Sequence, residues 1–165
     1  MKRLVLIFSL FVSSLGLAQQ EVKLDIADAL VIRSLEFSYE NYLNAESSLG
    51  ISVLVNLEDQ AVDFRYNENM IITPYFRNYF TLDAQWNIFG EAFLSVNSGK
   101  INVGAAENSV LQKYTDTALG IAVGSKYIAE SGLVIDLYVG AGRNLLGSAG
   151  PVVVPRAGLN VGWRF

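Results

Sequence analysis

The chain has 165 residues, neither cysteine nor histidine, and a formal net charge of −4. The absence of cysteine excludes a disulfide framework and a thiolate metal site. The acidic balance argues against a nucleic-acid-binding protein, which needs a basic face.

The first 18 residues have the pattern of a secretory signal peptide. Lys2 and Arg3 precede an apolar run over residues 4–17, and the small residue Ala18 follows it. The run is shorter than the roughly 20 apolar residues that a membrane-spanning helix needs. The pattern therefore predicts cleavage after Ala18 and one exported domain over residues 19–165.

Alternation of apolar with polar or small residues dominates the rest of the chain. A period of two over about ten residues is typical of a strand with two unlike faces. Eight such stretches occur, the first of them weak, near residues 22–28, 35–40, 48–56, 72–82, 86–97, 118–127, 133–142 and 156–165.

The connections between these stretches alternate in length. Short turns are expected near residues 44–46, 83–84 and 130–132, and longer segments near residues 58–68, 98–113 and 144–154. Only the first connection, near residues 29–33, is short where the pattern requires length. This plan predicts an all-β fold, a closed antiparallel up-and-down eight-stranded transmembrane β-barrel.

Alternation alone leaves open whether the apolar face meets lipid or lines the interior, as in a soluble lipocalin-like barrel. Glycine and alanine crowd the polar face, which suits a narrow lumen. Large aromatic residues on the apolar face gather toward the short turns and predict an aromatic girdle at a membrane interface: Phe80, Trp86, Tyr127, Trp163 and Phe165. Both features favour a barrel whose apolar outer face contacts lipid. Pro74 interrupts this pattern, and we expect it at a bulge near the rim.

The C-terminal strand carries a resemblance to known proteins. Leu159, Val161, Trp163 and Phe165 alternate up to a terminal aromatic residue, which resembles the assembly signal of bacterial outer-membrane proteins. The mature chain is similar in size and plan to barrels of the OmpX and OmpA transmembrane-domain type, and segments 37–40 and 72–80 resemble a poorly characterised family of such barrels. The resemblance implies contact with outer-membrane lipid and lipopolysaccharide and recognition by the barrel-assembly machinery. It implies no activity.

Charged residues on the polar face form the strongest candidate site. Parity directs eight of them into the lumen: Glu36, Glu40, Arg77, Glu91, Lys126, Asp136, Arg156 and Arg164. Enclosed opposite charges should pair, because an isolated buried charge is very costly. We expect a plug of ion pairs, reinforced by inward aromatic residues at positions 75, 79, 89, 93 and 138. The alternative is a gate or narrow ion path in which a pair such as Glu91–Arg77 opens.

The sequence offers few residues suited to catalysis or metal binding. Without histidine the chain lacks the base used by the enzymes we know among small outer-membrane barrels. Ser125 and Lys126 are adjacent on one strand and point to opposite faces. Acidic residues in the longer segment near residues 58–68 offer oxygen ligands for Ca²⁺ but lack EF-hand spacing: Glu58, Asp59, Asp63 and Glu68. We expect a solvated acidic loop there, no enzyme activity, no cofactor and no metal.

The sequence is compatible with three functions. The first is a monomeric structural or interaction protein with a plugged lumen and displayed extracellular loops. The second is a narrow channel or a transporter of small apolar compounds, as in OmpW-like barrels. The third is a soluble periplasmic ligand-binding barrel.

Overall fold

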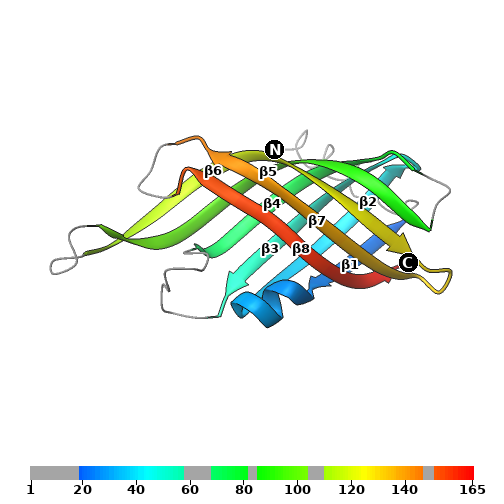
Figure 1. Ribbon diagram of the computed structural model, residues 1–165, viewed down its shortest axis with the longest axis horizontal. Helices are drawn as coiled ribbons and strands as arrows, with labels where there is room; N and C mark the ends of the chain where they lie inside the picture. Colours follow the sequence, from blue (N-terminus) through cyan, green and yellow to red (C-terminus); the bar gives the residue numbers. More distant parts are fainter. Residues whose placement is uncertain (1–18, 58–67, 82–84, 104–109, 147–150) are drawn as a thin grey trace, which may run out of the picture.

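The computed structural model describes residues 19–165 except residues 58–67, 82–84, 104–109 and 147–150 (Figure 1). The predicted signal peptide and the predicted turn at residues 83–84 therefore lie outside the described residues.

Eight antiparallel strands follow one another around a closed barrel in chain order (Figure 1). They are β1 (Gln20–Asp25), β2 (Ser34–Asn44), β3 (Ser47–Asn56), β4 (Glu68–Tyr79), β5 (Trp86–Val103), β6 (Val110–Ile128), β7 (Leu133–Asn144) and β8 (Val153–Arg164). The predicted all-β, closed up-and-down barrel of eight strands is confirmed.

The barrel closes where its first strand pairs with its last. The β1–β8 ladder runs from Glu21↔Arg164 to Asp25↔Asn160. Beyond it, the amide of Gln20 donates to the carbonyl of Phe165 at 3.1 Å, and the amide of Phe165 donates back at 2.9 Å. These bonds satisfy backbone groups that would find no partner in lipid.

The first strand is shorter than predicted. It ends at Asp25 rather than near residue 28, and the chain continues as a helical turn that includes η2 (Asp28–Ile32). The Asp25 carboxylate accepts the Asp28 amide at 3.0 Å, as a capping side chain does at the start of a helix. No helix of the described ranges is long and apolar enough to cross a membrane.

Because β1 is short, it fills only part of the barrel wall between β8 and β2. At the short-turn end, where residues 45–46 and 130–132 connect strands, β1 fills the wall. Toward the far end, β8 continues to Val153 and β2 begins at Ser34, but β1 has already ended. The helical turn with η2 lies beside this part of the wall (Figure 1).

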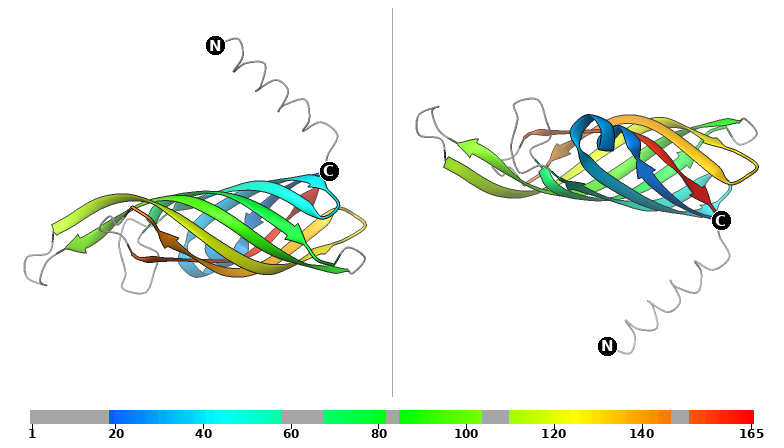
Figure 2. Two further views of the ribbon diagram at one scale, coloured as in Figure 1. Left: turned by 90° about the horizontal axis from the view of Figure 1, so that it is seen from above. Right: turned by 90° about the horizontal axis from the view of Figure 1, so that it is seen from below.

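Strands β5 and β6 form a long hairpin that projects from the far end (Figure 2). Their ladder continues to Val103↔Val110, whereas β7 pairs with β6 only from Ala118 onward. Much of the predicted loop over residues 98–113 is therefore strand. The alternation beyond residue 97 is too irregular to have indicated it.

Pro74 lies within β4 and not at a bulge near the rim, so that expectation was wrong. It pairs with Ile51 of β3. The ladder with β5 passes from Ile72↔Val96 to Tyr75↔Phe93 without a change of register. Only the pairs at Thr73 and Pro74 are missing there, because proline has no amide hydrogen to donate.

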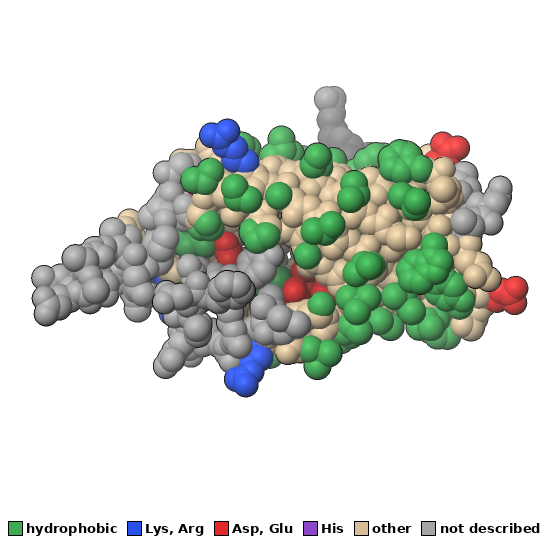
Figure 3. Space-filling view, in the orientation of Figure 1, with side chains coloured by type: hydrophobic (Ala, Val, Ile, Leu, Met, Phe, Trp, Pro, Cys, Tyr) green, Lys and Arg blue, Asp and Glu red, His purple; other side chains and the backbone are tan. Residues whose placement is uncertain are grey.

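Apolar side chains face outward and charged side chains face inward. Ile121, Val123 and Val139 are 72, 62 and 62 % exposed, whereas Lys126 and Asp136 are completely buried. Apolar side chains cover the strands in view, and projecting charged side chains gather toward the two ends (Figure 3). This orientation is opposite to that of a lipocalin-like barrel, whose apolar residues line the interior.

Small residues on the inner face make room for large rings. A Cβ atom on Gly124 would overlap the ring of Phe89, and one on Gly50 would overlap the ring of Tyr75. Glycine at these two positions therefore allows aromatic side chains to cross a narrow interior.

Candidate functional site

The centre of the interior is a buried network of ion pairs around Glu40 of β2. Its carboxylate accepts from Lys126 at 2.9 Å and Arg77 at 3.1 Å and also contacts Lys23. The hydroxyl groups of Ser48, at 2.6 Å, and Tyr79 donate to the same carboxylate. One acidic side chain thus joins β1, β2, β3, β4 and β6.

Asp136 of β7 is the second carboxylate of this network. It lies 2.7 Å from Lys23, 2.6 Å from Arg77 and 3.8 Å from Lys126. The side chains of all three cations are at most 1 % exposed. Because each cation contacts both Glu40 and Asp136, the charges are paired across the lumen, as buried charges require.

Arg77 connects this network to the next layer of the interior. Its Nε donates to Glu91 at 2.7 Å. Its guanidinium carbon lies 4.2 Å from the ring centre of Phe89 and 4.7 Å from that of Tyr75. Arginine stacks on aromatic faces in this way, so rings and ion pairs fill the same cross-section.

Toward the short-turn end the network extends to Glu21 of β1. Glu21 lies 2.7 Å from Lys126 and 2.6 Å from Arg164. The Arg164 guanidinium lies over the ring of Tyr42 at 4.5 Å. Arg164, the last residue of β8, is the most exposed cation of the network, with 17 % of its side chain exposed.

Toward the far end the network extends to Arg156 of β8. Its Nε donates to Glu91 at 2.6 Å, and its Nη1 lies 3.6 Å from Glu36. The ring of Tyr138 lies 5.0 Å from the guanidinium carbon. Asp25 and Asp28 lie with Glu36 at the end of β1, within ligand distance of one another.

A pocket lies beside this acidic group. The space between its lining side chains is about 400 Å³, and part of this space is continuous with solvent. Its lining combines polar and apolar side chains from η2 and five strands: Asp28, Glu36, Leu54, Ile71, Thr73, Phe93, Ser95, Val154, Pro155, Arg156 and Ala157. It lies at the part of the wall that β1 does not reach.

All eight charged residues expected in the lumen are inside the barrel, each with an ion-pair partner. Four further charged residues are buried in the interior and were not among the eight predicted there: Glu21, Lys23, Asp25 and Asp28. The first three alternate with Val22 and Leu24 in β1, so parity could have found them. Asp28 follows the end of the strand, where parity no longer applies.

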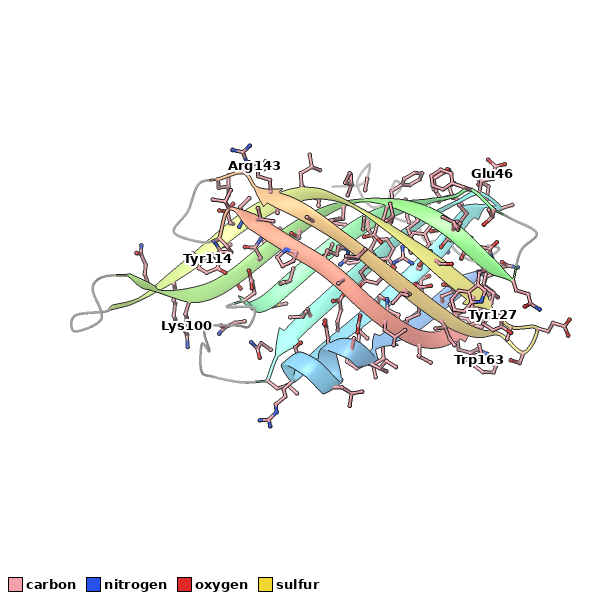
Figure 4. All side chains as sticks on the ribbon, in the orientation of Figure 1. Glu46, Lys100, Tyr114, Tyr127, Arg143 and Trp163 are labelled. Atoms are coloured by element: carbon pink, nitrogen blue, oxygen red, sulfur yellow. The ribbon has the colours of Figure 1, made fainter. Side chains whose placement is uncertain are left out.

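The aromatic residues expected in a girdle lie at the short-turn end. Figure 4 shows Tyr127 and Trp163 at the same end as Glu46, opposite Arg143, Tyr114 and Lys100. The Trp86 and Tyr127 rings are 5.4 Å apart. Phe80 and Phe165 are both 67 % exposed.

The residues of the predicted assembly signal lie on the final strand and at its end. Leu159 and Val161 are half-buried, and Trp163 and Phe165 are exposed. They alternate with the inward Asn160 and Arg164.

The predicted acidic loop is only partly within the described residues. Glu58, Asp59 and Asp63 lie outside them. Glu68 is the first residue of β4 and is buried, not solvated, because an irregularity of register between Glu68 and Met70 turns its side chain inward.

No protein-family model matches the sequence, and neither does any curated protein. Solved structures do match. The N-terminal β-barrel domain of Pseudomonas aeruginosa OprF is similar at 15 % identity with a TM-score of 0.63, over 90 % of this chain and 96 % of that one. Neisserial surface protein A (NspA) is similar at 13 % identity with a TM-score of 0.55, over 90 and 94 %. The chain has the fold of these small eight-stranded barrels.

Proposed function

We propose that this chain is an outer-membrane β-barrel protein with a plugged polar lumen, and that it acts through the segments displayed at its far end. The far end is then extracellular, and the short-turn end is periplasmic. The proposal includes export by a signal peptide cleaved after Ala18, insertion by the barrel-assembly machinery, a monomeric state and no catalytic role.

The main support for a plugged lumen is that charged side chains pair across it. Lys126 of β6 reaches both Glu21 of β1 and Glu40 of β2. These strands are not neighbours of β6 in the barrel, so the lysine side chain crosses the interior. Arg77 likewise reaches Asp136 from β4. An ion entering the lumen would have to displace a charged partner, and leaving that partner unpaired is costly.

The outer face of the projecting hairpin supports contact with lipopolysaccharide. Lys100 of β5 and Lys113 of β6 are directly opposite each other. Like charges in such a pair repel, and an anion between them relieves the repulsion. Phosphate groups at the membrane surface have the required charge.

Transport of small apolar compounds is the second candidate, and the pocket favours it. Leu54, Ile71 and Val154 line its apolar part. The wall beside it consists of a helical turn rather than a β1 ladder. In this proposal a compound would pass sideways from the pocket into the membrane, and the plug would remain closed.

Conductance across planar lipid bilayers tests the plug. We expect the purified, folded chain to insert without stepwise currents at neutral pH, because paired charges and rings occupy the lumen. Insertion is checked independently by the lower mobility of the unheated, folded form on a detergent gel. Reproducible stepwise currents from inserted protein would contradict the plugged lumen and favour a narrow channel.

A further inference from the structure

Three carboxylates meet where β1 ends, and the ion-pair network does not explain them. We call Asp25, Asp28 and Glu36 the acidic cluster. One ligand oxygen from each lies within 4.8 Å of the other two. Asp25 is completely buried, and Glu36 and Asp28 are 5 and 8 % exposed. Bringing three carboxylates together in the interior is costly unless something offsets their charge.

Two carboxylate oxygen atoms of the cluster accept no hydrogen bond within the described part of the chain. The Asp25 Oδ1 atom accepts the amides of Asp28, at 3.0 Å, and Leu159, at 3.4 Å. These bonds fix the carboxylate in place. Its Oδ2 atom is buried and accepts no hydrogen bond within the described part of the chain. The Glu36 Oε1 atom accepts none there either, and its ion-pair partner is the Arg156 Nη1 atom at 3.6 Å.

Asp28 and Glu36 also lie close together. One carboxylate oxygen of each lies within 4.8 Å of the other. Two buried, ionised carboxylates at this distance repel each other, and neither has a hydrogen to donate to the other. They must share either a proton or a cation.

The charge balance differs between the two halves of the interior. Around the network centre and the short-turn end, four carboxylates meet four cations: Glu21, Glu40, Glu91 and Asp136 with Lys23, Arg77, Lys126 and Arg164. The acidic cluster has only Arg156 nearby, 3.6 Å from Glu36 and also bound to Glu91. With all three carboxylates ionised, the cluster therefore has two more negative charges than it has cations among the described residues.

The pocket gives an ion access to the cluster. Asp28 and Glu36 are part of its lining, and the hydroxyl-bearing residues Thr73 and Ser95 lie in the same lining. The Ser95 hydroxyl is buried without a hydrogen-bond partner in the described structure. Apart from the Arg156 guanidinium, which also lines the pocket, the polar side-chain atoms of this lining are oxygens, the ligands that Ca²⁺ takes.

We propose that the acidic cluster binds one Ca²⁺ ion. A divalent cation neutralises the two uncompensated charges and bridges the Asp28 and Glu36 carboxylates. Ca²⁺ suits this donor set because it takes oxygen ligands in flexible geometry and accepts water as a further ligand. The ion would tie η2 to β1 and β2 and so hold the far half of the wall closed.

Calorimetric titration with CaCl₂ tests the site on the folded, EDTA-treated chain in detergent. We expect one Ca²⁺ per barrel. Asp28→Asn should weaken binding by about tenfold or more, because affinity depends on the number of charged ligands. The matched control is Glu130→Gln, which removes a carboxylate from the exposed turn at the other end and should leave the affinity within about twofold.

Unfolding in urea gives a second readout. Ca²⁺ should raise the urea midpoint of the wild-type chain, EDTA should reverse the rise, and Asp28→Asn should not respond. Glu36→Gln replaces Asp28→Asn if that variant does not fold. A wild-type chain that binds no Ca²⁺, or a folded cluster variant that binds as tightly as wild type, would overturn the proposal. The first result would indicate that a shared proton holds Asp28 and Glu36 together.

Discussion

Replacing Arg77 with methionine should lower the free energy of unfolding by about 3–5 kcal/mol, the cost of removing one partner from a buried ion network. Arg77 is 1 % exposed and is paired with Glu40, Glu91 and Asp136 at once. Methionine keeps part of the volume but leaves these carboxylates with fewer cations. Equilibrium unfolding in urea, in lipid vesicles and followed by tryptophan fluorescence, measures the change.

Arg143→Met is the matched control for this substitution. Arg143 is exposed at the far end of β7 (Figure 4), and its replacement should change the unfolding free energy by no more than about 0.5 kcal/mol. If Arg77→Met were as stable as the control, the ion pairs would not hold the lumen together.

Replacing Val123 with arginine should destabilise the barrel in a lipid bilayer by about 2–4 kcal/mol, the cost of a charge facing lipid near the bilayer midplane. Val123 is 62 % exposed. It lies on β6 about midway between Ala118, where pairing with β7 begins, and Ile128. On a water-exposed surface the same change would have little effect, so the size of the loss distinguishes lipid from water.

Gln112→Arg on the same strand provides the control. Gln112 is exposed on the projecting part of the β5–β6 hairpin, beyond the end of the β6–β7 ladder. Arginine there should alter stability by no more than about 0.5 kcal/mol. Equal effects at residues 112 and 123 would argue against a lipid-facing wall.

The sequence predicted the barrel because alternation is a local property of each strand. The predicted turns also indicate which residues within a hairpin should lie opposite each other, although Glu91–Arg77 was the one pair named in advance. A turn at residues 130–132 puts Lys126 opposite Asp136, and a turn near residues 83–84 puts Arg77 close to Glu91. The structure contains both pairs in register.

Contacts between distant strands could not be predicted in this way. Lys126 contacts Glu21, and Arg156 contacts Glu91, only because the sheet closes into a barrel narrow enough for side chains to reach across it. Their distances depend on the tilt and stagger of the strands, which alternation does not encode.

Local departures from the strand pattern also escaped prediction. The irregularity of register between Glu68 and Met70 reverses the parity of Glu68. Asp25 ends β1 by capping a helical turn, and this turn brings Asp28 to Glu36. The acidic cluster depends on such a departure, so it became visible only in three dimensions.

The central claim is that hydrocarbon surrounds the apolar face of each strand. Because the chain has no cysteine, a nitroxide can be attached at one position alone through Val123→Cys, or through Gln112→Cys as a reference. In lipid vesicles, electron paramagnetic resonance should show the label at residue 123 colliding mainly with oxygen, which concentrates in hydrocarbon, and the label at residue 112 colliding mainly with a water-soluble nickel complex. A label at residue 123 that the nickel complex reaches as readily as residue 112 would contradict the account.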